Sequence, residues 1–294
     1  MEKELSLEDI SGNLLKNREV SFLDYTGIRE VSLTQEELAQ FYQGDFPILN
    51  LLENQYVFFR DETDKIVDKF FWREGHLERV PFLTIKNDFC GIIKPRNPYQ
   101  ECAIHMLNDR KAPVKIFTSV YGGGKDFLMS AQALSLIEKG IFKKLIYIRP
   151  NVSLGDVPDI GYLKGDEFSK LSWTLAPLWD KFGGRETVEQ MCQNGQIELV
   201  PLPHIRGRSF TNALVYVSEA QNITREVARL IISRIGENSE IWYNGDYRQV
   251  DRRMYEGDNG LRATIDALAG NSLFEMVYSP ITERSEVARL ADLI

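Results

Sequence analysis

Residues 119–127, with the sequence SVYGGGKDF, place three adjacent glycines beside a lysine. Glycines let backbone N–H groups approach anionic oxygens at the start of a helix, and Lys125 would reach the outer phosphates of a nucleotide. We therefore expect a nucleotide-binding loop made of Gly122, Gly123, Gly124, Lys125, Asp126 and Phe127. The alternative is a plain turn, because a glycine run beside a lysine is not specific on its own.

The loop departs from the usual phosphate-binding pattern at two positions. Ser119 stands where the first glycine is expected, and Asp126 replaces the Ser or Thr that normally coordinates Mg²⁺. A second element, ALVYVSEAQN at residues 213–222, is an apolar strand in which Glu219 is expected to orient the attacking water. Ser218 stands before it, where an Asp is expected.

The two departures compensate in charge, since the loop gains a carboxylate and the strand gains a hydroxyl. We hypothesise that Asp126 is a direct Mg²⁺ ligand and that Ser218 is a second-shell or water-mediated one, because Mg²⁺ accepts either oxygen type. The alternative is a loop that has lost turnover, in which Asp126 without a metal would repel a triphosphate.

The elements that must position these residues differ along the chain. After residue 93, six apolar runs (VKIFTSV, KLIYIRP, QIELVPL, ALVYVSE, EIWYNGD and LFEMVYSP) alternate with helical segments. This pattern predicts a mostly parallel sheet covered on both faces, an α/β fold. The helix after the loop should span residues 126–138 and end at Gly140, with one buried side made of Phe127, Leu128, Ala131, Leu134 and Ile137.

Two smaller regions precede this core. Residues 1–45 form a partly helical N-terminal segment, with a helix over residues 33–43 capped by Thr34 and Glu37. Residues 46–93 read as a small antiparallel β-rich domain, and its aromatic residues are either its core or a stacking face for nucleic acid. Residues 94–294 form the nucleotide-binding domain.

The amino-acid composition limits the possible partners of the protein and its cellular compartment. The net charge is −8, and residues 1–93 hold 18 acidic and 10 basic residues against 25 of each in residues 94–294, so no global basic field for nucleic acid exists. The three cysteines and three histidines lack disulfide or zinc spacing, which favours a reducing compartment. The acidic N-terminus is not a signal peptide and no apolar run reaches membrane-spanning length. We expect a cytoplasmic protein without membrane contact.

From about Ile93 onward the chain resembles the PhoH-like P-loop ATPases. The segments that carry the resemblance occur in the family's order over roughly 200 residues: IKPRNPYQ, HIRGRSFTNA, SEAQN, NGDYRQVD and ITERSEVAR. Where this chain has Ser218, the family has Asp. The resemblance implies a RecA/helicase-like three-layer core, ATP binding and hydrolysis, ring-shaped oligomers such as hexamers, and in some members action on single-stranded RNA. Several members carry an N-terminal PIN ribonuclease domain, for which residues 1–45 are too short, so nuclease activity is not expected.

The matching motifs supply further candidate residues. Gln100 can read the adenine edge with its amide or lie on a helix surface. Asp246 and Gln249 follow a strand end, where ligands bind in open α/β sheets, and Gln249 would contact the γ-phosphate or a water. Turn formation by Asp246 is the alternative.

The arginines have alternative roles as well. Arg206 or Arg208 would act as an arginine finger on a neighbouring subunit's nucleotide, or form a surface salt bridge. Arg284 and Arg289 share this ambiguity. Three more arginines, at positions 248, 252 and 253, would grip a nucleic-acid backbone or a subunit interface, or form a solvated turn.

The expected function is therefore an ATP-binding protein that hydrolyses ATP through Lys125, Asp126, Glu219 and an arginine from another subunit. The alternative is a nucleotide-binding scaffold that binds ATP or ADP without turnover and so controls its own assembly. A third hypothesis is an RNA-binding module with helicase-like action, to which the balanced charge of residues 94–294 gives little support.

Overall fold

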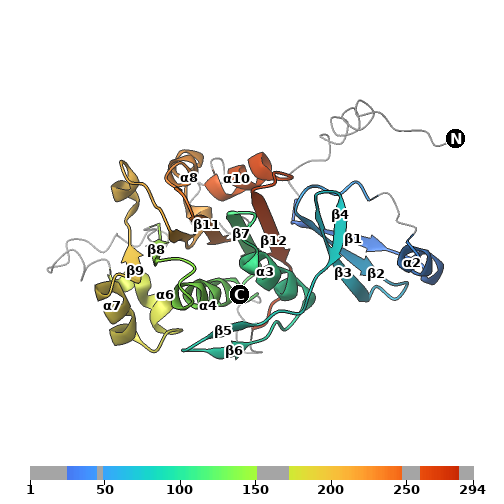
Figure 1. Ribbon diagram of the computed structural model, residues 1–294, viewed down its shortest axis with the longest axis horizontal. Helices are drawn as coiled ribbons and strands as arrows, with labels where there is room; N and C mark the ends of the chain where they lie inside the picture. Colours follow the sequence, from blue (N-terminus) through green and yellow to red (C-terminus); the bar gives the residue numbers. More distant parts are fainter. Residues whose placement is uncertain (1–24, 45–48, 151–171, 247–258, 285–294) are drawn as a thin grey trace, which may run out of the picture.

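The chain is described by a computed structural model that covers residues 25–44, 49–150, 172–246 and 259–284 (Figure 1). These residues form a large α/β core and a smaller β-sheet beside it. The N-terminal residues of the described chain, drawn in blue, build the smaller sheet together with helix α2 (Gln35–Tyr42). Within these residues, the helices are all too short or too polar to span a bilayer.

The core sheet has six strands that are all parallel. Their order is β12 (Phe274–Ser279), β7 (Val114–Ser119), β11 (Glu240–Gly245), β10 (Ala213–Val217), β8 (Lys144–Ile148) and β9 (Ile197–Leu199). Every residue of β10, β11 and β12 is buried, as expected for parallel strands covered on both faces. All six apolar runs form strands. The predicted fold class, an α/β core of the P-loop NTPase type preceded in the sequence by a small β-rich region, is confirmed.

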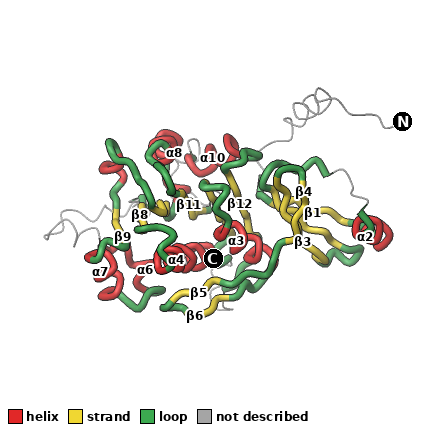
Figure 2. The backbone as a smooth tube through the Cα atoms, in the orientation of Figure 1, coloured by secondary structure: helices red, strands yellow, loops and turns green. Residues whose placement is uncertain are grey.

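Helices cover both faces of this sheet and make it the middle of three layers (Figure 2). On one face lie α3 (Pro98–Asn108) and α4 (Lys125–Glu138), which pack on Phe117, Tyr216 and Trp242. The other face carries α8 (Arg225–Ile232) and α10 (Gly260–Leu268), which pack on Val215 and Ile241. Other helical segments of the described residues are η3 (Ser172–Leu175), α6 (Ala176–Trp179), α7 (Arg185–Gln193), η4 (Leu202–Ile205) and η5 (Ala220–Asn222).

Helix α4 follows the glycine loop directly, as predicted. Gly124 precedes it with a left-handed φ of 84°, and the Leu128 N–H donates to the Gly124 carbonyl at 2.9 Å. The helix is buried on nearly all sides from Leu128 to Ile137, because the hairpin of β5 (Ile85–Asn87) and β6 (Gly91–Ile93) packs on it opposite the sheet. Phe127 was predicted on the buried side; it is instead 38% exposed.

The accessory sheet has the order β1 (Ile28–Ser32), β2 (Gln55–Arg60), β3 (Ile66–Arg73) and β4 (His76–Arg79). Strands β2 to β4 form the predicted antiparallel meander, but β1 pairs parallel to β2. The sheet therefore draws a strand from the predicted N-terminal segment and does not begin at residue 46. Helix α2 begins with the predicted capping box, in which Thr34 and Glu37 bond each other's backbone N–H groups.

The aromatic side chains of this sheet are its core. Tyr56, Phe58 and Phe59 are fully buried and Phe71 is nearly so, which excludes them as an open stacking face for nucleic acid. Tyr56, Phe58 and Phe71 join the hydrophobic cluster of the α/β core, whereas Phe59 packs with α2. The two sheets therefore share a continuous apolar interior.

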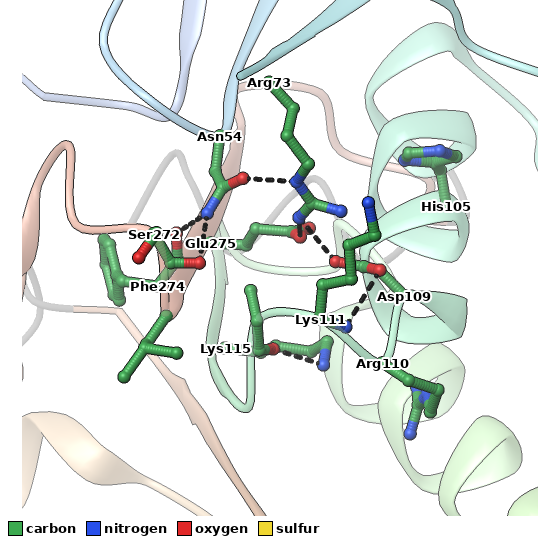
Figure 3. A network of polar contacts seen from close by, with 12 residues as sticks. Asn54, Arg73, His105, Asp109, Arg110, Lys111, Lys115, Ser272, Phe274 and Glu275 are labelled. Carbon is green, nitrogen blue, oxygen red and sulfur yellow. Dashed lines mark hydrogen bonds and ion pairs between the residues drawn. The ribbon is translucent and has the colours of Figure 1, made fainter.

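Polar contacts lock the accessory sheet to the edge strand β12 (Figure 3). The Asn54 amide donates to the carbonyl oxygens of Ser272 at 2.9 Å and Phe274 at 3.1 Å. Arg73 donates through Nε to Asn54 at 2.7 Å, and its Nη2 lies 2.6 Å from both Asp109 and Glu275. The guanidinium of Arg73 is thus the shared partner of one helix-end carboxylate and one buried strand carboxylate.

Candidate nucleotide-binding site

The glycine loop leaves the carboxyl end of β7, a strand with β12 on one side and β11 on the other. The Val120 N–H donates to the Ser279 carbonyl at 3.2 Å, which extends the β7–β12 ladder into the loop. Ser119 is fully buried, and its hydroxyl donates to the Val120 carbonyl at 2.9 Å. A serine is therefore accommodated at this position by turning its hydroxyl back onto the loop.

The glycines of the loop are required by their neighbours. A Cβ at Gly122, whose φ is +73°, would overlap the side chain of Arg284, and one at Gly123 would lie 2.5 Å from the Ser119 hydroxyl. The Gly122 carbonyl accepts the Glu283 N–H at 3.0 Å, and the Gly123 carbonyl accepts the Gln100 amide at 3.1 Å. These bonds engage the loop's carbonyls from the protein side, while the N–H groups of the first turn of α4 lie outside the helical ladder. Such N–H groups are the ones that bind phosphate at a helix N-terminus.

Lys125 lies among charged groups from three other motifs. Its Nζ donates to the Ser119 carbonyl at 3.4 Å. Burial lowers the pKa of Lys125, the charges of Asp246 and Glu219 oppose this, and Arg284 adds to it. The structure therefore brings Lys125, Glu219, Asp246 and Arg284 into one electrostatic neighbourhood, although they lie up to 159 residues apart in sequence.

Gln100, predicted to read adenine, is buried at the start of α3. Its carbonyl oxygen accepts the Arg96 N–H at 2.9 Å and its amide nitrogen donates to Gly123. In this arrangement Gln100 positions the loop. Its contact with a base remains a prediction.

Three donors hold the Asp126 carboxylate. Oδ1 accepts the Tyr216 hydroxyl at 2.8 Å and the Asn244 amide at 2.8 Å, and Oδ2 forms an ion pair with Lys181. The Asn244 amide also donates to the Tyr216 hydroxyl at 2.6 Å, so the two side chains form one unit. These three partners are not among the residues predicted from the sequence. Tyr216 and Asn244 carried a signal, because a polar group in a buried strand needs a partner, but Lys181 carried none.

This donor set does not fit a divalent cation at Asp126. An ammonium group already occupies one carboxylate oxygen, and two neutral donors occupy the other. Ser218 is buried just after β10, and the described part of the chain has no group of three or more His, Cys, Asp or Glu side chains that could hold a metal. The predicted Asp126/Ser218 magnesium pair therefore requires Lys181 to leave Asp126 first.

Glu219 lies at the carboxyl edge of the sheet in a left-handed conformation, with φ 54°. A non-glycine residue in this region is strained, and such strain is found at functional sites. The Gln221 amide donates to Glu219 Oε2 at 2.8 Å, and Arg149 Nη2 lies 3.8 Å from Oε1. The side chain is 43% exposed, so a water can approach the carboxylate.

Asp246 is buried behind Glu219, and its N–H donates to the Gln221 side chain at 3.2 Å. A Cβ at Gly245 would lie 2.5 Å from the same Gln221 oxygen, so the NGD and SEAQN motifs are in close contact. Gln249 lies outside the described residues, as do Arg289 and the arginines at 248, 252 and 253.

Three of the candidate arginines fall within the described residues, and they lie in two places. Arg284 reaches the loop, where its guanidinium carbon lies 4.8 Å from the centre of the Tyr121 ring. Arg208 pairs with Glu198 at 2.5 Å, and Arg206, which is 77% exposed, lies 3.7 Å from Glu226. Arg206 and Arg208 thus form ion pairs within the chain, and their action on another subunit remains a prediction.

Comparisons with known proteins show which family the chain resembles. A family model described as PhoH-like protein matches residues 92–289. Protein PhoH2 of Bacillus subtilis is 28% identical over 282 residues, which cover 91% of this chain and 63% of that protein. Protein PhoH2 of Mycolicibacterium smegmatis is 30% identical over 202 residues, covering 67% of this chain and 46% of that protein. The chain thus spans less than two thirds of the length of these relatives.

The match to the Bacillus subtilis protein covers 91% of this chain, which is more than the α/β core contains. It therefore includes part of the region before residue 92. Among solved structures, the UvsW helicase from Bacteriophage T4 aligns with a TM-score of 0.39 and 14% identity, covering 68% of this chain and 64% of that one.

Proposed function

Because this chain belongs to the PhoH-like protein family, we propose that it binds ATP and ADP at the glycine loop and that it hydrolyses ATP. Family membership and the P-loop fold support a nucleotide-binding, ATPase-type protein. One observation carries the assignment to this site. Lys125, at the end of the loop on β7, shares its electrostatic neighbourhood with Glu219 and Asp246, which follow β10 and β11.

The chemistry follows from these positions. The N–H groups from Gly122 to Phe127 and the Lys125 ammonium bind the phosphates. The Gly123 N–H donates to the Val120 carbonyl at 3.2 Å, and it must turn from this bond to reach a phosphate. Burial lowers the pKa of Lys125, and the charges of Asp246 and Glu219 oppose this shift by favouring its protonated form. Glu219 orients a water for attack on the terminal phosphate, and Arg206 or Arg208 from a neighbouring subunit of a ring, such as a hexamer, stabilises the developing charge. Single-stranded RNA is the proposed polymer, on the resemblance alone.

A second function, a nucleotide-binding scaffold without turnover, is favoured by the contacts of Glu219. Its two carboxylate oxygens already face Gln221 and Arg149. A carboxylate held in this way is a weaker partner for water. In this role ATP and ADP would set the assembly state of the protein, and ATP would dissociate without being hydrolysed.

Phosphate release from ATP, measured with and without single-stranded RNA, tests the enzyme. We expect Glu219→Gln to slow release about 100-fold or more while ADP affinity changes little, since a carboxylate that orients water acts in the chemical step. Glu237→Gln, at an exposed position outside the site, is the matched control. Equal release by both variants contradicts the role of Glu219, and the absence of release by the unmodified protein contradicts the enzyme. Nucleotide binding without release, accompanied by a nucleotide-dependent change in molar mass by light scattering, supports the scaffold.

A further inference from the structure

Lys181 places a positive charge beside the glycine loop, close to where the sequence predicted a metal ion. It follows α6 in the chain, and its ammonium group forms an ion pair with Asp126 in the first turn of α4. Burial lowers the pKa of Lys181 to about 8, and the charge of Glu219 opposes this shift. Lys181 therefore pairs with the carboxylate that the sequence assigned to a metal and lies within the electrostatic influence of the one assigned to water.

The segment around Lys181 is fixed from behind. The Lys181 carbonyl accepts the Cys90 thiol at 3.4 Å, and the neighbouring Phe182 is fully buried, with its ring centre 6.2 Å from that of Phe89. The Lys181 side chain itself is only 16% exposed. Because its backbone is held by these contacts and its side chain is shielded from solvent, Lys181 has a defined position in the site.

The Asp126 carboxylate is equally fixed. Tyr216 and Asn244 bind its other oxygen from two core strands, which orients the carboxylate toward Lys181. Without Lys181, the unpaired negative charge of Asp126, whose side chain is 34% exposed, would stand in the first turn of the helix that receives the phosphates, and it would repel them. With Lys181, the pair is neutral and the positive end of the helix is left to attract the phosphates.

Resting on the proposed nucleotide binding, we propose that Lys181 replaces the divalent cation as the counter-ion of Asp126, so that the loop binds nucleotides without Mg²⁺. Lys181 is thereby a positioning residue, since it acts on the phosphates through Asp126. Asp126 and Lys181 thus form a neutral pair, although the two residues lie 55 positions apart in the sequence.

The experiment is equilibrium binding of ADP to the full chain, by isothermal titration calorimetry, once in excess EDTA and once in Mg²⁺ at the same ionic strength. For the unmodified protein we expect the two dissociation constants to agree within about threefold. For Lys181→Met we expect binding in EDTA to weaken about tenfold or more, because Asp126 is left unpaired, and Mg²⁺ to restore it. Lys139→Met, an exposed lysine at the far end of α4, should behave as the unmodified protein.

Asp126→Asn supplies a second variant that keeps the side-chain shape. It leaves the Lys181 charge unpaired, so ADP binding in EDTA should tighten; weakened binding in a variant that still folds, judged by circular dichroism, overturns the proposal. The proposal is also overturned when the unmodified protein binds ADP only with Mg²⁺, which would support the Asp126/Ser218 metal pair. Failure to bind ADP in either condition is a different result, and it refutes the proposed function itself.

Discussion

Arg73 is a cation that joins the accessory sheet to the core, and we predict that Arg73→Met destabilises the protein by about 3 kcal/mol. Its Nη2 lies 2.6 Å from both Asp109 and Glu275, and the three side chains are 11%, 14% and 0% exposed. Removing one partner of a buried ion pair costs about 3–5 kcal/mol, because the other charge stays buried without compensation. Burial raises the pKa of Glu275, so Glu275 holds a proton in the folded chain and Asp109 is the carboxylate that loses its counter-ion, which places the loss at the lower end of the range.

Thermal unfolding at pH 7, followed by circular dichroism, measures this loss. A change of 1 kcal/mol shifts the midpoint by about 2–4 °C in chains of this order of size, so the midpoint should fall by about 6–12 °C. The matched control is Arg262→Met, because Arg262 pairs with Asp266 at 3.9 Å and the two side chains are 36% and 41% exposed. An exposed pair contributes little, and its loss should shift the midpoint by less than about 2 °C. Equal shifts in the two variants would refute the anchoring role of Arg73.

Three further predictions follow from single contacts. Burial and a hydrogen bond with Asp109 raise the pKa of Glu275, so the folded chain keeps a proton that the unfolded chain releases above about pH 4.3, and stability falls as the pH rises. The Glu275→Gln variant has no carboxyl group here and lacks this pH-dependent loss of stability. In thermal melts, the difference between its unfolding midpoint and that of the unmodified protein should therefore increase from pH 5 to pH 8. A difference that stays constant with pH contradicts the raised pKa of Glu275. Gly123→Ala places a Cβ 2.5 Å from the Ser119 hydroxyl and should weaken ADP binding about tenfold or more by calorimetry. Gly140→Ala has open space around its Cβ but strains a φ of +69° at the other end of α4, so it should lower stability and leave binding unchanged. Tyr216→Phe removes the hydroxyl that donates to Asp126 at 2.8 Å and accepts from Asn244 at 2.6 Å, which should cost about 1–2 kcal/mol in urea unfolding, and an unchanged midpoint would be evidence against that network.

Local pattern was sufficient for the core because its strands are buried on both faces. Each of the six apolar runs is long enough to identify a strand, and the helix after the loop is bounded by Gly124 and Gly140, both with positive φ. The capping box of Thr34 and Glu37 was predictable for the same reason, since both partners lie within one helical turn.

Contacts made across the fold could not be predicted in this way. Strand β1 buries only Ile28 fully, and it pairs with residues about 28 positions later, so its pattern alone does not indicate a strand. Lys181 looks like any solvated lysine until the fold brings it to Asp126. The motif predicts either a base contact or a helix-surface position for Gln100. The side chain is instead buried, and the closeness of Gly123, which only the tertiary structure shows, gives its amide a partner within the chain.

The central claim is that the backbone N–H groups of the glycine loop bind a polyphosphate. Selective ¹⁵N labelling of the 21 glycines, followed by two-dimensional NMR during an ADP titration, tests it directly. We predict that the amide signals of Gly122, Gly123 and Gly124, assigned by substitution, shift with a single dissociation constant while that of Gly140, beyond the far end of α4, stays in place. Saturable ADP binding that moves other glycine signals and leaves the three loop signals unchanged would contradict the account.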